Sequence, residues 1–261
     1  MIHKLTDIHP NAKIEKNVVI EAFTTISADV EIGEGTRIGS NVTIMDGARI
    51  GKNCKIFPNA VISAIPQDLK FAGEHTIVEI GDNTTIRECV TVNRATASKG
   101  KTVVGSNCLL MAYVHVAHDC VIGDNAIIVN SVQIAGEVEV GEWAIIGGTS
   151  AVHQFTKIGK HAIISGGSLV KQDVPPYVTA AHEPLAYVGV NSIGLKRRNF
   201  TNDDINFIQE IYRLLFQSGL NTSQALEKIE ADIKNNLIKS TIVDFIKNSQ
   251  RGLIKGYHSN K

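Results

Sequence analysis

The sequence has few aromatic residues and no excess of either charge. Phe, Trp and Tyr make up 5% of the 261 residues, whereas glycine occurs 22 times. This ratio is typical of repetitive β structure. Lys plus Arg and Asp plus Glu each number 26, so the formal net charge is zero. A nucleic-acid or membrane-surface binder needs an excess of positive charge, so we expect neither kind of partner.

Long apolar runs and paired cysteines are also missing. No window approaches the ~20 apolar residues of a membrane span, and the first residues, MIHKLTDIHPNAKI, lack the apolar stretch of a signal peptide. The four cysteines form no CxxC pair and show no zinc-finger spacing. The sequence therefore predicts a cytoplasmic protein with reduced thiols and no integral membrane segment.

A six-residue repeat runs through most of the chain. Every sixth residue from Ile8 to Ile62 is isoleucine, and the step resumes at Ile80 and again at Val104, up to Val170. A period of six fits neither a helix nor a simple strand alternation, but it fits short strands that bend every six residues. Three such sides close a triangular coil of eighteen residues, which can pair with its neighbours at about 4.8 Å. The aliphatic residue at every sixth position, which we call the leader of its repeat, then stacks inside.

We therefore predict a parallel β-helix over residues 8 to about 175, ended by Pro175 and Pro176. Gaps in the stepping at 64–75 and 93–101 keep the flanking register, so they are predicted to be loops that project from the prism. The fourth residue after each leader is small or β-branched and points inward. This register predicts that three cysteines are core residues: Cys54, Cys108 and Cys120. Cys89 lies off the inward register, with no evident partner.

The sequence becomes helical from Thr201. TNDDINFIQEIYRLLFQSG has a capping residue, acidic residues in its first turn and one apolar face, and Gly219 ends it. Residues 221–237 and 242–250 predict two more helices. The expected domains are a β-helix at 1–190 and a C-terminal α-helical domain at 191–261 that covers one end of the prism. The basic run LKRRNF between them is either a charged linker or a clamp for phosphates.

The segment YVHVAHDCVIG places two histidines on the outer surface of this scaffold. His115 and His118 fall outside the inward register, so neither is a core residue. Steps of eighteen from His118 reach Gly136 and then Gln154, which should stack beside it on one face. Three interpretations remain open: a solvated surface, a catalytic site, or a zinc site completed by His153 across a subunit interface.

Several ordered motifs resemble the UDP-N-acetylglucosamine O-acyltransferase family, the first enzyme of lipid A biosynthesis. They are QDLKFAGE, LLMAYVHVAHDC, AIIGGTSAVHQF, QDVPPYV, GVNSIGLKRR and RGLIKG. The resemblance implies a left-handed β-helix, a homotrimer with active sites between subunits, and no metal or bound cofactor. It also implies transfer of an (R)-3-hydroxyacyl group from acyl carrier protein to the 3-hydroxyl of UDP-N-acetylglucosamine.

The resemblance also assigns roles to residues. His118 matches the general base, Asp119 the carboxylate that orients it, and Gly136 the residue whose backbone N–H receives the oxyanion. Gly166 matches the position that limits acyl-chain length, where glycine favours longer chains. The remaining matches are substrate-binding positions in the sugar loop, the groove and the nucleotide site: Gln67, Asp68, Lys70, His115, His153, Gln154, Asn191, Arg197 and Arg198.

Three residues depart from the family pattern. Asn93 and Glu137 stand where the family commonly has histidine, and Ile193 stands where it often has a carboxylate. These departures touch neither the expected base nor the oxyanion donor. Alternative functions are an N-acyltransferase of the same pathway, which ordinarily has an extra N-terminal domain, a coenzyme A-dependent acetyltransferase, a zinc-dependent carbonic anhydrase and a non-catalytic solenoid.

Overall fold

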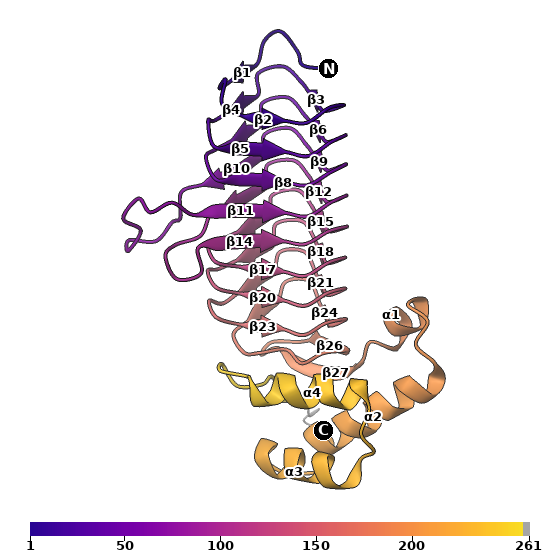
Figure 1. Cartoon of the computed structure of the whole chain (residues 1–261). Coiled ribbons are helices and arrows are strands. Elements are labelled where there is room, and N and C mark those ends of the chain that lie inside the picture. The colour runs from indigo at the N-terminus through magenta and orange to yellow at the C-terminus, as the bar shows by residue number, and fades with distance from the viewer. Residues whose placement is uncertain (258–261) are drawn as a thin grey trace.

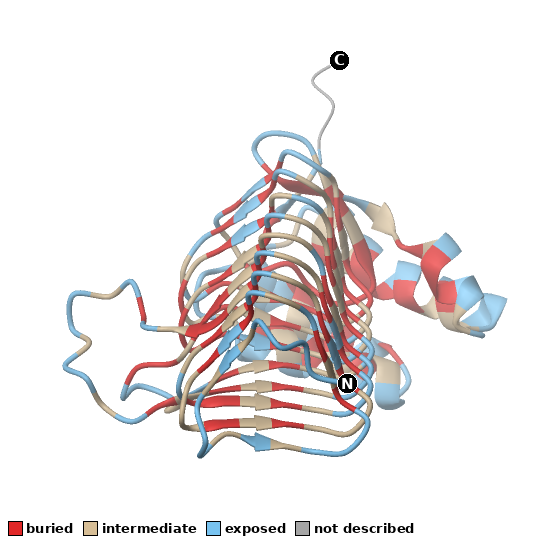
Figure 2. Cartoon of the chain, turned by 90° about the horizontal axis from the view of Figure 1, so that it is seen from above, coloured by how far each residue is buried: buried red, intermediate tan, exposed pale blue. Residues whose placement is uncertain are grey.

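The computed structural model describes residues 1–257. It is a triangular prism of stacked coils with helices at its C-terminal end (Figure 1). A view along the prism shows buried residues lining the inside of three flat sides (Figure 2). Within the described residues the strands form three sheets, one for each side of the prism.

The strands of each sheet come from successive coils. The first sheet joins β1 (Asp7–Ile8), β4 (Thr25–Ile26), β7 (Thr43–Ile44), β10 (Val61–Ala64), β13 (Thr91–Asn93), β16 (His115–Val116), β19 (Gln133–Ile134), β22 (Ala151–Val152) and β25 (Leu169–Val170). The second joins β2 (Lys13–Ile14), β5 (Val30–Ile32), β8 (Ala48–Ile50), β11 (Ile77–Ile80), β14 (Lys101–Val104), β17 (Val121–Ile122), β20 (Glu139–Val140) and β23 (Lys157–Ile158).

The third sheet extends beyond the hexads into the C-terminal region. It joins β3 (Val19–Ile20), β6 (Arg37–Ile38), β9 (Lys55–Ile56), β12 (Thr85–Ile86), β15 (Leu109–Leu110), β18 (Ile127–Ile128), β21 (Ile145–Ile146), β24 (Ile163–Ile164), β26 (Val178–Ala181), β27 (Ala186–Val190) and β28 (Lys255–Gly256). Neighbouring strands within the coils are parallel, and β26 and β27 are antiparallel.

The register predicted from the hexads is confirmed. Leading residues pair with each other eighteen residues apart, as Ile8 with Ile26 and Val116 with Ile134, and nearly all are buried. Each fully buried leader contributes about 1.5–3 kcal/mol relative to exposure. Many corners contain a residue with positive φ, and successive residues of this kind are often six positions apart. Asn, Asp and Gly adopt this left-handed backbone conformation most readily. Cys54, Cys108 and Cys120 are buried, and Cys89 is a corner residue.

The predicted end of the solenoid at Pro175 and Pro176 is wrong. After the prolines, β26 adds to β24 in parallel and so continues the coil by one more side. The prolines fit because they lie between strands, where no N–H is needed for the sheet. β28 then pairs with β27, so the chain beyond the helices returns to the same sheet.

The C-terminal helices are α1 (Ser192–Arg197), α2 (Asn202–Gln217), α3 (Thr222–Asp232) and α4 (Leu237–Lys247). Thr201 caps α2 in a capping box with Asp204, as its sequence predicts. Residues 195–197 of the LKRRNF run belong to α1, and the choice between a charged linker and a phosphate clamp stays a prediction. The division at residue 190 stays a prediction, and the last four residues of the expected second domain lie outside the described residues. Within residues 1–257 no helix has the length and apolar composition to cross a bilayer.

The two inserted loops leave the prism at the same edge, where the first sheet passes into the second (Figures 1 and 2). The flanking strands stay paired, as Ile62 with Val92 and Ile80 with Val104. Both predicted loops are therefore confirmed as insertions that do not disturb the coil.

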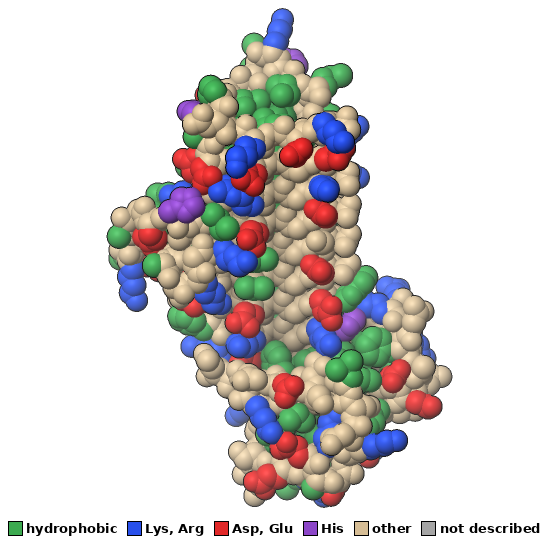
Figure 3. Space-filling view, in the orientation of Figure 1, with side chains coloured by type: hydrophobic (Ala, Val, Ile, Leu, Met, Phe, Trp, Pro, Cys, Tyr) green, Lys and Arg blue, Asp and Glu red, His purple; other side chains and the backbone are tan. Residues whose placement is uncertain are grey.

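The outer faces of the sheets differ in chemistry. The second sheet presents alternating charges (Figure 3), with ion pairs Lys13–Glu31 and Lys101–Glu79 across neighbouring coils. Such exposed pairs contribute about 0–1 kcal/mol each. The third sheet instead presents an outward apolar ladder of half-buried residues: Leu109, Ile127, Ile145 and Ile163.

Candidate active site

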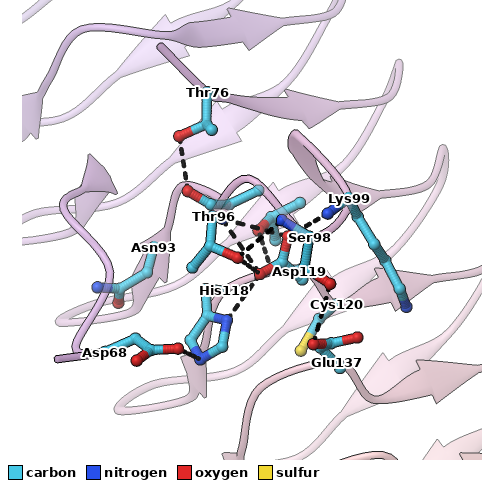
Figure 4. Close-up of polar contacts among 12 residues, drawn as sticks. Asp68, Thr76, Asn93, Thr96, Ser98, Lys99, His118, Asp119, Cys120 and Glu137 are labelled. Carbon is cyan, nitrogen blue, oxygen red and sulfur yellow. Dashed lines mark hydrogen bonds and ion pairs between the residues drawn. The ribbon is translucent and has the colours of Figure 1, made fainter. Parts of the chain in front are cut away.

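His118 lies on the edge from which the loops project, at the corner between β16 and β17 (Figure 4). The corner of the next coil holds Gly136, and Gln154 follows one coil later. The eighteen-residue step therefore places these residues in a column, as the sequence predicts. The loops at 64–75 and 93–101 leave the same edge, so their side chains reach the histidine.

The interpretation of His118 as a solvated surface residue is wrong. The side chain points out of the prism, yet the residue is only 7% exposed because loop residues cover it. Its Nδ1 lies 2.7 Å from Asp119 Oδ2, and its Nε2 lies 3.8 Å from Asp68 Oδ2. The second distance is too long for a hydrogen bond, so Asp68 accepts no hydrogen bond from Nε2.

Asp119 is fully buried and is held by the second loop. Its carboxylate accepts the Thr96 hydroxyl at 2.7 Å and the N–H groups of Thr96 and Lys99 at 3.1–3.2 Å. Its own N–H donates to Thr102 Oγ1 at 2.8 Å. An ionised carboxylate has only acceptor sites, so the remaining contact requires His118 to carry its proton on Nδ1. Nε2 is then the free basic nitrogen.

Gly136 is in direct contact with the imidazole. A Cβ on this residue would lie 2.5 Å from both Cε1 and Nε2 of His118, well inside van der Waals contact. Only glycine therefore lets the next coil lie against the ring in this position. The N–H of Gly136 is not used in the hydrogen-bond ladder between coils, so it remains available as a donor.

The predicted sugar loop contributes Asp68 to this cluster. Asp68 Oδ1 accepts the backbone N–H of Lys70 at 2.9 Å, which fixes the carboxylate toward His118. Gln67 and Lys70 are exposed. Their side chains are thus available at the mouth of the site.

The other histidines differ from His118. His115 is half-buried in β16, with Nδ1 2.7 Å from Thr91 Oγ1. Burial lowers the pKa of His115, and the neighbouring His118 lowers it further. His153 is exposed and its Nδ1 lies 3.0 Å from the carbonyl oxygen of Gln154. Among the described residues, no group of three His, Cys, Asp or Glu side chains is placed to hold a metal ion.

The predicted nucleotide residues lie around α1, on another edge. Asn191 is buried and caps α1, because its Oδ1 accepts the Gly194 N–H and its Nδ2 donates to the His161 carbonyl. The Arg198 guanidinium stacks 4.7 Å from the centre of the Trp143 ring, at the corner between the second and third sheets. Burial lowers the pKa of Arg198, as does the charge of the neighbouring Arg197.

Gly166 lies at the third edge, where the third sheet passes into the first. It is exposed, and a Cβ there would approach the Gly148 carbonyl oxygen at 3.1 Å. One chain thus places the predicted base, nucleotide residues and chain-length residue on three different edges of the prism. It brings together only the members of the His118 column and the first loop.

Sequence reasoning missed the residues that hold the site in place. Thr96 and Thr102 bind Asp119, and Trp143 supports Arg198. A signal for Thr102 was present, because it lies in β14, the strand that follows the second loop. No periodic signal marks Thr96, since it lies within an insertion where the hexad register does not apply.

Comparison with known proteins identifies the same architecture. Residues 173–254 match a family model described as Udp N-acetylglucosamine O-acyltransferase; Domain 2. Residues 29–64 and 101–136 match the bacterial transferase hexapeptide model. These matches cover two segments of the prism and most of the C-terminal region.

The two relatives described next carry the same name. The acyl-[acyl-carrier-protein]–UDP-N-acetylglucosamine O-acyltransferase of Chlorobaculum parvum is 63% identical over 194 residues, 74% of each chain. The enzyme of the same name from Thermodesulfovibrio yellowstonii is 44% identical over 255 residues, 97% of this chain and 99% of that protein.

Solved structures agree with these relatives. A UDP-N-acetylglucosamine acyltransferase from Bacteroides fragilis matches with a TM-score of 0.96 and 51% identity, covering 98% of this chain and 100% of that one. The Francisella novicida enzyme matches with a TM-score of 0.96 and 42% identity, covering 100% and 95%. The predicted left-handed parallel β-helix with a C-terminal helical region is confirmed. The chain belongs to the UDP-N-acetylglucosamine O-acyltransferase family.

Proposed function

We propose that this acyltransferase moves an (R)-3-hydroxyacyl group from acyl carrier protein to the 3-hydroxyl of UDP-N-acetylglucosamine, the first step of lipid A biosynthesis. The names of the relatives support these two substrates. The observation that carries the mechanism is the buried Asp119–His118 pair, in which Asp119 Oδ2 lies 2.7 Å from Nδ1 while Nε2 lies against Gly136.

His118 is the general base of this proposal. The sugar hydroxyl approaches Nε2 and its oxygen attacks the thioester carbonyl carbon while its proton passes to Nε2. General base catalysis by a positioned side chain contributes about 10²–10⁴ in rate. Asp119 holds the imidazole in the productive tautomer and stabilises the imidazolium that forms.

The backbone N–H of Gly136 stabilises the oxyanion of the tetrahedral intermediate. Removing one such donor costs other enzymes about 10²–10³ in kcat. The intermediate then collapses, the carbon–sulfur bond breaks, and the imidazolium returns its proton to the leaving thiolate. The products are the ester at the sugar hydroxyl and the free thiol of the carrier protein, with no cofactor consumed.

We propose that the active unit is a homotrimer. The predicted substrate residues lie on three edges of one chain, so a complete site requires residues from a neighbouring copy. The apolar ladder on the third sheet and the exposed Leu69 of the first loop support such an interface. We also propose a cytoplasmic location, in keeping with cysteine thiols that are all unpaired.

The substrate is expected to span the groove between copies. Asp68, Gln67 and Lys70 bind the sugar and its phosphates, with His115, His153 and Gln154 lining the groove. Asn191 fixes α1, whose last residue Arg197 and C-cap residue Arg198 bind the diphosphate. Gly166 lies along the acyl chain.

An activity assay with UDP-N-acetylglucosamine and 3-hydroxyacyl-acyl carrier protein tests the proposal. We expect O-acylated product to form at a rate that chelators do not change. His118→Ala should lose at least about 100-fold in kcat and retain the fold and the oligomer. His9→Ala, an exposed histidine near the N-terminus, is the matched control. Normal turnover by His118→Ala, or activity that requires zinc, would overturn the mechanism.

A further inference from the structure

We propose that Thr96 is a positioning residue, which acts on His118 through Asp119; this inference rests on the proposed function. The second loop, at 93–101, is the only source of hydroxyl and loop N–H donors to the Asp119 carboxylate in the described part of the chain. The loop thus serves as a receptor for the carboxylate rather than as a cover alone (Figure 4).

The direction of the Thr96 hydroxyl is fixed by its second contact. The Ser98 N–H donates to Thr96 Oγ1 at 3.2 Å, so this oxygen is an acceptor there. Its own hydrogen is left for Asp119 Oδ2, which is 2.7 Å away. The same Oδ2 accepts His118 Nδ1 at 2.7 Å. One carboxylate oxygen therefore links Thr96 directly to the proposed base.

Contacts with the first loop and the next coil hold Thr96 in place. Thr76 Oγ1 donates to the carbonyl of Ala95 at 2.6 Å, and the Ala97 N–H donates to Glu74 Oε1 at 3.0 Å. Ser98 Oγ donates to Glu137 Oε1 at 3.2 Å. The loop is thus anchored on both sides of Thr96.

Two of the departures from the family pattern take part in this anchoring. Asn93 is buried, and its amide donates to the Ile65 carbonyl, which joins the start of the second loop to the first. Glu137 receives Ser98, as above. Asn93 and Glu137, which stand where the family commonly has histidine, therefore help to hold the second loop against Asp119.

A substitution series at Thr96 tests the role. Thr96→Val should lower kcat roughly ten-fold, the size of one hydrogen bond to a charged group. KM should change less than about two-fold, because Thr96 is buried and bonded to Asp119. Thr96→Ser keeps the hydroxyl and should stay within about two- to three-fold of the native kcat. Thr96→Ala serves if the valine variant does not fold.

The control is Thr84→Val, which removes a buried hydroxyl bound to Gly105 and Cys108 at a different corner. It should leave kcat unchanged while altering thermal stability. A residue that only stabilised the fold would behave like Thr84, and Thr96→Ser would not restore kcat selectively.

A double-mutant cycle with Asp119→Asn separates the inference from the proposed function. If Thr96 acts through Asp119, adding Thr96→Val to the Asp119→Asn variant should cost less than about two-fold in kcat. Additive losses, or a normal kcat for Thr96→Val when Asp119→Asn is impaired, would overturn the role of Thr96. Normal kcat in both Asp119→Asn and His118→Ala would instead overturn the proposed mechanism.

Discussion

Gly136→Ala is the most direct perturbation of the base, because it adds one methyl group against His118. The added Cβ would lie 2.5 Å from Cε1 and Nε2 and 3.1 Å from Cδ2 of the ring. Ordinary carbon contacts lie at about 3.5–4.0 Å, so the ring must move by about 1 Å. Gly136 lacks the positive φ that many corner residues have, so alanine fits the backbone and the strain falls on the imidazole.

A displacement of that size is expected to reduce kcat by about 100-fold, or about 2.7 kcal/mol of activation free energy. The movement also strains the 2.7 Å contact between His118 Nδ1 and Asp119. Steady-state kinetics with UDP-N-acetylglucosamine and the acyl carrier protein thioester measure the loss. Thermal melting shows whether the fold is kept.

The same substitution in a His118→Ala background shows the route of the effect. Without an imidazole the methyl group meets no ring, so the double variant should be no slower than His118→Ala alone. A full additional 100-fold loss would refute the reasoning, since the methyl group would then act on the substrate or oxyanion rather than on the base. Unchanged kcat in the single variant would refute it as well.

Three further predictions concern other parts of the chain. Burial, with the charges of Arg198 and Lys160, lowers the pKa of His161 from 6.5 to about 4. Because the unfolded chain then binds the proton first, unfolding free energy should fall by up to about 3 kcal/mol from pH 6.5 to pH 4. His161→Phe should melt with a weaker pH dependence, and an equal dependence would contradict this. Arg198→Lys should raise KM for UDP-N-acetylglucosamine about ten-fold through loss of bidentate phosphate binding, and an unchanged KM in initial-rate assays would contradict that role. Gly166→Met should shift preference toward shorter acyl chains in a panel of acyl carrier protein thioesters, and an unchanged preference would remove Gly166 from the acyl channel.

The hexads made the prism predictable because each position has a single task. A leader such as Ile86 must fill the core, and a corner residue must accept a left-handed backbone, so the period alone gives the register. The column of His118 and Gly136 followed from that register. The antiparallel strand β27 and the helix α1 were not predictable, since neither has a repeat and the short α1 depends on a cap by Asn191.

The parts of the site that come from the loops could not be predicted from the sequence, for a different reason. Thr96 meets Asp119 only because the loop folds back over the corner through contacts with Thr76 and Glu74. Those contacts join segments about twenty residues apart, with no pattern to mark them. The burial of His118 also depends on the loops. The register alone gave it an outward position, which left a solvated side chain as one interpretation.

The coil of eighteen residues also restricts how such a chain can change in length. An insertion of six or twelve residues between β14 and β16 would turn His118 onto another side of the column, away from the loops that grip Asp119. Only a whole extra circuit would return it to the same edge, and even then one step farther from those loops. Variation in length is therefore expected at the projecting loops and at the open N-terminal end, where no angular relationship to the histidine is at stake.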